Sequence, residues 1–297
     1  MSAKVTGILC GVASAFAFGT TVVTGRSLAK ADLGFQVSLG VPFTLGGAIL
    51  VVALIARRRP LFPAPGERLW IVLLGAGIYA TQSALFFSAL ERGTAAAVTL
   101  LFYAYPAVVV LLEIPLERRW PAASTAAAVV LAMIGATTIV ASSGEVDITR
   151  TGVGFALGAG GMFAVNLLIS ERRVSATDSV TAAAWLAITT GLAQLGWGVA
   201  TASLENPSEH WNALLGLGAA RAVAFAFMFA ALRRLGPANT SVALTFEALF
   251  AILLAATFIS EPVQALQGVG GVAILAAAVV IARTPDPRPA PAAAPLP

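Results

Sequence analysis

Cysteine and histidine are almost absent from this 297-residue chain, which has one of each, Cys10 and His210. A single cysteine excludes an intrachain disulfide and any cluster of cysteine ligands for a metal. The long apolar stretches also contain no cluster of carboxylates that could serve as an acid–base pair. We therefore expect no metal, no cofactor and no enzymatic activity.

Charged side chains are also scarce. They make up 11% of the chain, against about 25% in an average soluble protein. Hydrophobic residues make up 58%, and the mean hydropathy is +0.89. A water-soluble fold could not bury so much apolar surface, so we expect a lipid bilayer as the main partner. The net charge of +4 fits basic residues gathered at one membrane face, and we expect no nucleic-acid partner.

Long apolar runs fill most of the chain and are separated by short segments rich in charge, proline and glycine. A membrane-spanning helix needs roughly 20 apolar residues, so the runs predict an all-α integral membrane fold with ten transmembrane helices. They cover residues 5–29, 34–56, 68–91, 94–116, 121–141, 149–170, 179–202, 211–232, 237–259 and 263–283. The Pro/Ala-rich tail at 284–297 is predicted to be disordered.

The distribution of Lys and Arg predicts how these helices cross the membrane. Cytoplasmic loops carry an excess of basic residues. A cytoplasmic N-terminus places four basic residues outside, Arg26, Lys30, Arg92 and Arg150, and leaves Arg221 within a helix. The remaining ones fall inside, namely Lys4, Arg57, Arg58, Arg59, Arg68, Arg118, Arg119, Arg172, Arg173, Arg233, Arg234, Arg283 and Arg288. An even number of spans then puts the C-terminus in the cytoplasm too.

The chain contains an internal repeat. The stretch FFSALERGTAAAVTLLFYAYPAVVVLLEIPLERRW resembles FMFAALRRLGPANTSVALTFEALFAILLAATFISEP, and GILCGVASAFAFG resembles GVGFALGAGGMFA. We therefore divide the chain into a first five-helix repeat at 1–145 and a second at 146–283. Because five is odd, the two repeats have opposite orientations in the membrane. Inverted repeats are typical of transporters that bind substrate near the bilayer midplane.

These repeats resemble the paired EamA units of the drug/metabolite transporter superfamily. The motifs FFSALERGTAAAVTLLFYAYP and GPANTSVALTFEALFA carry the likeness. Within that superfamily the chain is most similar to the YddG-type exporters of aromatic amino acids. The resemblance implies ten helices, alternating access and an inner-membrane location. One departure is Glu247-Ala248, where family members often carry Glu-Pro; here a proline follows Tyr105 in the first repeat.

Two ionisable side chains lie deep inside apolar runs, where such residues are costly and mark candidate functional sites. Arg221 lies 14 residues before the turn near Leu235, and Glu247 lies 12 residues after it. At 1.5 Å per residue both are about 18–21 Å from that turn. They could form a structural pair that locks two helices. Alternatively, they face the transport path and bind the carboxylate and the ammonium of an amino acid.

An offset of 142 residues relates the two repeats and extends this site. It maps Arg221 onto Tyr79 and Glu247 onto Tyr105. Helical spacing and polarity add further candidate substrate-binding residues, namely Gln82, Phe86, Phe102, Asn166, Trp185 and Phe225. Aromatic residues around such a site would suit a planar apolar side chain.

The sequence thus predicts an alternating-access exporter of amino acids, aromatic ones first, that can work as a monomer in the plasma (inner) membrane. Other small molecules stay open as substrates, including drugs, sugars, nucleosides and lipophilic cations. Proton antiport and facilitated diffusion are both compatible with the residues. Alternatives of another class are a membrane receptor or scaffold without transport activity, and an intramembrane enzyme.

Overall fold

The structure is a computed structural model that describes residues 2–28, 34–118, 120–142, 144–204, 206, 210–258 and 264–283. Within these residues the regular elements are helices. One isolated antiparallel β-bridge pairs Gly93 with Ile148. The tail predicted to be disordered, 284–297, lies outside the described residues. The helices are α1 Ala3–Leu28, α2 Phe35–Ala56, α3 Arg68–Val72, the π-helix η1 Leu73–Tyr79, α4 Ala80–Leu90, α5 Ala95–Phe102, α6 Tyr105–Glu117, α7 Ala123–Ala141, α8 Arg150–Arg173, α9 Ser179–Ala200, α10 Trp211–Leu244, α11 Phe246–Phe258 and α12 Ala265–Arg283.

Eight helical stretches of the described residues are long and apolar enough to cross a membrane. The helix α9 is not among them, and α11 alone is shorter than a span. The long helix α10 counts once, although it contains a non-helical residue, Gly236, with φ 76° and ψ 175°. Only glycine adopts this backbone conformation readily, and Pro237 follows it. The chain therefore turns sharply at Gly236, and α10 comprises two helices. The count of ten spans stays a prediction.

Two further breaks interrupt helices at positions that the 142-residue offset relates. One lies at Tyr103 and Ala104 between α5 and α6, and the other at Thr245 between α10 and α11. The first precedes Pro106, which has no N–H to donate. The second forms without a proline: the Thr245 hydroxyl bonds the Val242 carbonyl at 2.7 Å. The helix is therefore interrupted before Glu247 even though residue 248 is alanine and not proline.

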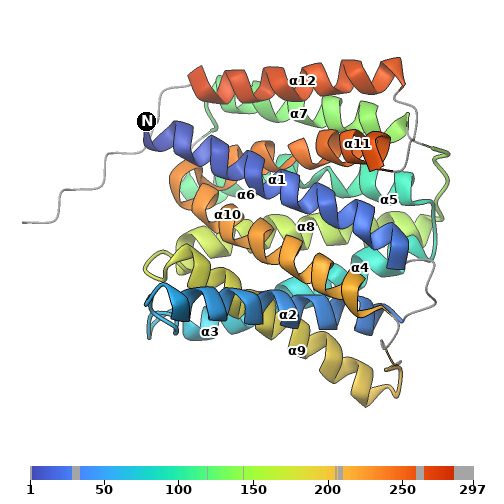
Figure 1. Ribbon diagram of the computed structural model, residues 1–297. Coiled ribbons are helices and arrows are strands. Elements are labelled where there is room, and N and C mark those ends of the chain that lie inside the picture. The colour runs from blue at the N-terminus through green and yellow to red at the C-terminus, as the bar shows by residue number, and fades with distance from the viewer. Residues whose placement is uncertain are drawn as a thin grey trace, which may run out of the picture.

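The helices pack in pairs that follow the same offset (Figure 1). The second and seventh segments, α2 and α9, lie side by side, as do the fifth and tenth, α7 and α12. The first segment, α1, packs against α10 and α11, while the sixth, α8, packs against η1, α4, α5 and α6. The contacts of α1 with the second repeat thus correspond to those of α8 with the first.

Two ends of this bundle are named here by the predicted topology. The outer face carries the start of α2, the end of α4 and the start of α12. The cytoplasmic face carries the turns 57–67 and 174–178 and the N-terminus, at the left of Figure 1. Apolar side chains cover the sides between these faces: Val52, Val199 and Val272 are each more than 60% exposed. Such a surface is suited to lipid contact.

Glycine allows the paired helices to approach closely. A Cβ atom on Gly270 of α12 would lie 2.6 Å from the Gly135 carbonyl oxygen of α7, and the converse distance is the same. Small residues at such contacts are the usual way for membrane helices to pack. Two residues earlier on α12, Gly268 faces away, and an added Cβ would meet nothing within 4 Å.

We predict that Gly270→Ala destabilises the protein and that Gly268→Ala does not. The first change forces backbone against backbone and should cost about 1–3 kcal/mol, as overpacking does elsewhere. Thermal unfolding of the purified variants in detergent checks this, with Gly268→Ala as the matched control on the same helix. Equal midpoints for both variants would contradict the described packing of α7 on α12.

Candidate functional site

A cavity of about 650 Å³ occupies the outer half of the bundle. Its wall is built from α1, α2, η1, α4, α5, α6, α7, α8, α10, α11 and α12. Phe35, Leu90 and Gln267 line it where helices meet the outer face, and Tyr79 and Arg221 line it near mid-helix. Its lining residues include none from the cytoplasmic helix ends. The cavity therefore extends from the middle of the bundle toward the outer face.

Arg221 enters the cavity from the first part of α10. Its guanidinium carbon lies 4.3 Å from the ring centroid of Phe43 on α2, a cation–π contact. Its Nη1 atom is buried and has no hydrogen-bond partner. No described carboxylate is within ion-pairing distance of it. The guanidinium thus keeps hydrogen-bond donors available to a ligand.

Glu247 enters the cavity from the first turn of α11, immediately after the break at Thr245. Gly19 of α1 allows this approach, since an added Cβ would lie 3.4 Å from the Glu247 carbonyl oxygen and closer still to Phe250. No described residue forms an ion pair or a hydrogen bond with the Glu247 carboxylate. Arg221 and Glu247 therefore share one cavity without pairing, and the alternative of a locking pair does not describe this conformation.

Aromatic rings surround the space around these two charges. Tyr79 makes edge contacts with Phe43 and Phe225, with ring centroids 5.5 and 5.1 Å apart. It also interacts electrostatically with both Arg221 and Glu247. Tyr105 packs edge-on against Phe163 at 4.9 Å. Its hydroxyl donates to the Ser241 carbonyl at 3.1 Å, which holds α6 against α10.

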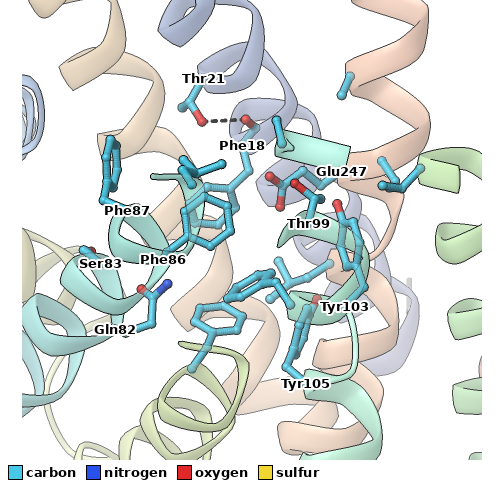
Figure 2. A pocket seen from close by; sticks show the side chains of 18 of the residues that line it. Phe18, Thr21, Gln82, Ser83, Phe86, Phe87, Thr99, Tyr103, Tyr105 and Glu247 are labelled. Atoms are coloured by element: carbon cyan, nitrogen blue, oxygen red, sulfur yellow. Dashed lines mark hydrogen bonds between the residues drawn. The ribbon is translucent and has the colours of Figure 1, made fainter. Parts of the chain in front are cut away.

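Figure 2 shows how the polar side chains are arranged in the cavity. Gln82 and Glu247 approach it from opposite sides, and Thr99 and Tyr103 lie on the side of Glu247. The Gln82 side chain is 6% exposed, and its Oε1 atom has no hydrogen-bond partner. This wall therefore offers a free acceptor opposite the carboxylate.

Most of the residues selected from the sequence line this one cavity: Tyr79, Gln82, Phe86, Phe102, Tyr105, Arg221 and Glu247. Three others do not. Phe225 is fully buried behind Tyr79, and Asn166 is fully buried in α8, where its Oδ1 accepts from Ser170 at 3.4 Å. Trp185 lies at the cytoplasmic face, where its indole N–H donates to the Leu61 carbonyl at 2.7 Å. Its polar tip is occupied by a loop, so Trp185 has no place at the cavity.

Several lining residues had no signal in the sequence. Phe43 and Phe163 are ordinary phenylalanines within apolar runs, and only the fold brings them beside Arg221 and Tyr105. Tyr103 was within reach of prediction, because it stands between Phe102 and Tyr105 in FYAYP. In an uninterrupted helix Tyr103 would lie on a different face from Phe102 and Tyr105. The helix break at Tyr103 and Ala104 allows it to line the cavity.

At the cytoplasmic face the two repeats are joined by a contact that we call the Glu67 clasp. The Glu67 carboxylate, before α3, accepts bonds from the backbone N–H groups of Ala176 and Thr177 at 2.7 and 2.8 Å and from the Thr177 hydroxyl at 2.5 Å. The same hydroxyl accepts from the Ala64 N–H at 3.0 Å. One buried carboxylate thus ties the turn 57–67 to the turn 174–178.

The charge of Glu67 is essential to this clasp. Burial of the side chain raises its pKa, but the bonds from Thr177 and Ala176 outweigh this and lower the pKa below the ordinary value of 4.5. A carboxyl with a lowered pKa in the folded state contributes stability above its unfolded pKa. That contribution is lost as the pH falls through the lowered value, so the clasp should weaken only in acid.

A smaller cavity of about 280 Å³ lies near the cytoplasmic face beside the turn at Gly236. The 142-residue offset relates it to the outer end of the large cavity. It maps Ala95, Ala96, Ala255 and Gln267 of the large cavity onto Pro237, Ala238, Glu113 and Thr125, and each of these four lines the smaller one. The smaller cavity is therefore the counterpart, in the other repeat, of the mouth of the large one.

The sequence pattern of the EamA-like transporter family matches the chain twice, over residues 5–141 and again over residues 150–283. The protein belongs to the EamA-like transporter family. It is therefore a multi-pass membrane transporter, and its family is one of transporters and not of enzymes. This confirms the resemblance at the level of the family, and the aromatic-exporter subtype stays a prediction.

Comparison with solved structures supports the same fold. One crystal structure, described only as that of a protein, matches 93% of this EamA-like chain and 96% of its own with a TM-score of 0.78. The two sequences are 18% identical, so the likeness concerns the fold alone. No curated protein sequence matches the chain significantly.

We predict that Glu67→Ala opens the cytoplasmic face of the transporter. A hydrogen bond to a charged group contributes about 1.5–3 kcal/mol, and this variant loses three. With Thr125→Cys placed in a Cys10→Ala background, a membrane-impermeant maleimide applied from the cytoplasmic side should label Cys at 125 several-fold faster when Glu67 is replaced. Glu91→Ala, which removes an exposed carboxylate paired with Arg92, is the control. An unchanged labelling rate would show that the clasp does not hold this face closed.

Proposed function

We propose that this transporter exports amino acids, aromatic ones first, by alternating access. The proposal rests on one observation: Arg221 and Glu247 line the same aromatic-walled cavity without forming an ion pair with each other. An amino acid carries a carboxylate, an ammonium and a side chain. Arginine can hold a carboxylate through two parallel hydrogen bonds, and Glu247 offers the opposite charge for the ammonium.

The aromatic wall supports a planar apolar side chain as the third element of recognition. Rings prefer edge-to-face or offset contacts at centroid distances of about 4.5–7 Å. Phe86, Phe102 and Tyr105 present such faces and edges on the wall. A cavity of about 650 Å³ also lies within the range typical of small-molecule sites. In this proposal Tyr79 and Gln82 complete the site, whereas Phe225 supports Tyr79 from behind.

The topology proposed is ten spans in two repeats, 1–145 and 146–283, of opposite orientation, with both termini in the cytoplasm of a cell and the protein in its inner (plasma) membrane. The distribution of Lys and Arg supports the cytoplasmic termini. The repeated pairing of segments under the 142-residue offset supports an approximate twofold axis in the membrane plane.

The two unlike ends of the bundle support alternating access. The large cavity extends toward the outer face, and the Glu67 clasp holds the cytoplasmic face closed. The smaller cavity beside Gly236 is the proposed cytoplasmic mouth of the path. We infer that this conformation faces outward, and that release of the clasp, with closure around α4 and α11, produces the inward-facing one. In this proposal a monomer carries out the whole cycle.

Counterflow in proteoliposomes tests this function. Vesicles loaded with unlabelled phenylalanine should take up external radiolabelled phenylalanine, and vesicles without protein should not. Excess unlabelled phenylalanine should compete strongly, while phenethylamine and phenylpropionate, which each lack one of the two charges, should compete at least tenfold less well. Competition by phenethylamine alone would instead identify lipophilic cations as the substrates, and no exchange of any amino acid would overturn the proposal.

We predict that Arg221→Ala lowers this exchange at least a hundredfold while the protein stays folded. Loss of a bidentate charged contact costs about 3 kcal/mol or more, which corresponds to that factor. Arg234→Ala is the matched control, because Arg234 is on the same helix but exposed, bonded to the Ala230 carbonyl at 2.7 Å. Wild-type exchange by a folded Arg221→Ala variant would remove Arg221 from the site.

A further inference from the structure

The Glu247 carboxylate is the acidic group of the large cavity: no other Asp or Glu is among the lining residues. It stands on the wall of a space that extends toward the outer face, and no described residue neutralises it or donates a hydrogen bond to it. A carboxylate in such surroundings, inside a bundle with lipid-facing sides, is costly as an unpaired anion. It becomes neutral by binding either a cationic group or a proton.

The titratable and charged groups around Glu247 leave both choices open. Tyr103 and Tyr105, on the side of α5 and α6, and Tyr79 of η1 lie near enough for its charge to act on them. Arg221 of α10 is the one cation of the lining, and it contacts Phe43 and not Glu247. The residues that α1, α7 and α12 contribute to the lining, such as Thr21, Ile139 and Gln267, carry no charge.

A proton and an ammonium group would therefore compete for one carboxylate. In the conformation described, the cavity extends toward the outer face, and the Glu67 clasp lies at the other side. Our proposal requires that Glu247 exchange protons with the outer solution in this state. After the path opens to the cytoplasm, the same carboxyl meets the cytoplasmic solution instead.

We propose that Glu247 is a proton carrier, and that the protein exchanges an outward-moving amino acid for an inward-moving proton. The amino acid leaves to the outer side, and the free carboxylate takes up one proton there. The neutral carboxyl returns to the inward-facing state and releases that proton to the cytoplasm, where the ammonium of the next substrate replaces it. The O–H bond of the Glu247 carboxyl forms on the outer side and breaks on the cytoplasmic side, and no other covalent bond changes. This inference rests on the proposed function, because the competing cation is the substrate's ammonium.

Two measurements on the full chain separate coupling from transport itself. Counterflow of radiolabelled phenylalanine at equal pH on both sides reports transport. Accumulation of the same probe, with the interior one pH unit more acidic and the membrane potential clamped by potassium and valinomycin, reports coupling. A one-for-one exchange should concentrate phenylalanine inside by up to about tenfold per pH unit. Because the exchange is reversible, mixed orientation of the protein does not change this limit.

The role of Glu247 is tested by proton release on binding. Adding phenylalanine to purified wild-type protein in weakly buffered detergent should release protons at mildly acidic pH, and Glu247→Gln should release none. Glu247→Gln should also fail to accumulate phenylalanine in the gradient. Glu91→Gln, at an exposed carboxylate near the outer face, should behave as wild type in both assays.

Each outcome decides a different claim. Counterflow without accumulation in a pH gradient overturns proton exchange and leaves the exporter intact. Accumulation by Glu247→Gln overturns the assignment to Glu247. Absence of counterflow for every amino acid overturns the proposed function and the inference together.

Discussion

The separation of a guanidinium and a carboxylate within one cavity is the constraint on which the rest of this structure depends. In a medium of low dielectric, Arg221 and Glu247 would attract strongly. The fold keeps them apart by placing Arg221 over the Phe43 ring and by starting α11 at a helix break. Two unpaired charges are costly to maintain in a membrane protein. A ligand with both charges can satisfy them at once, which ties the packing of the helices to substrate recognition.

Helix irregularities are gathered around that cavity. The π-helix η1 ends at Tyr79, and the breaks at Tyr103 and Thr245 precede Tyr105 and Glu247. The distorted backbone of this region is supported by side chains of α9, since Thr190 donates to the Gly75 carbonyl and Gln194 to the Ala80 carbonyl, each at 3.0 Å. Irregular backbone at membrane depth is tolerated where it lines a cavity or is buried in protein. These irregularities place four polar side chains on the wall of the large cavity, namely Tyr79, Tyr103, Tyr105 and Glu247.

Much of this arrangement could be predicted from the sequence, because membrane helices leave strong signals. The apolar runs predicted the helices to within a few residues of their observed ends. Arg221 and Glu247 were recognised as candidates because they are ionisable residues inside such runs. The repeat then added Tyr79 and Tyr105. Other features depend on tertiary contacts that no local pattern reports. In the sequence, Glu67 is one of several carboxylates near helix ends, and its partner Thr177 is more than a hundred residues away. The helix break at Thr245 has no proline to indicate it. Trp185 donates to the carbonyl of Leu61, in a loop whose path the sequence does not indicate.

Whether both charges bind one ligand is the central claim, and a structure of the transporter with phenylalanine bound tests it most directly. The account predicts ligand density in the large cavity, with the carboxylate within about 3 Å of the Arg221 guanidinium, the ammonium toward Glu247 and the ring among Phe86, Phe102 and Tyr105. A direct Arg221–Glu247 ion pair, with phenylalanine bound elsewhere or not at all, would contradict it.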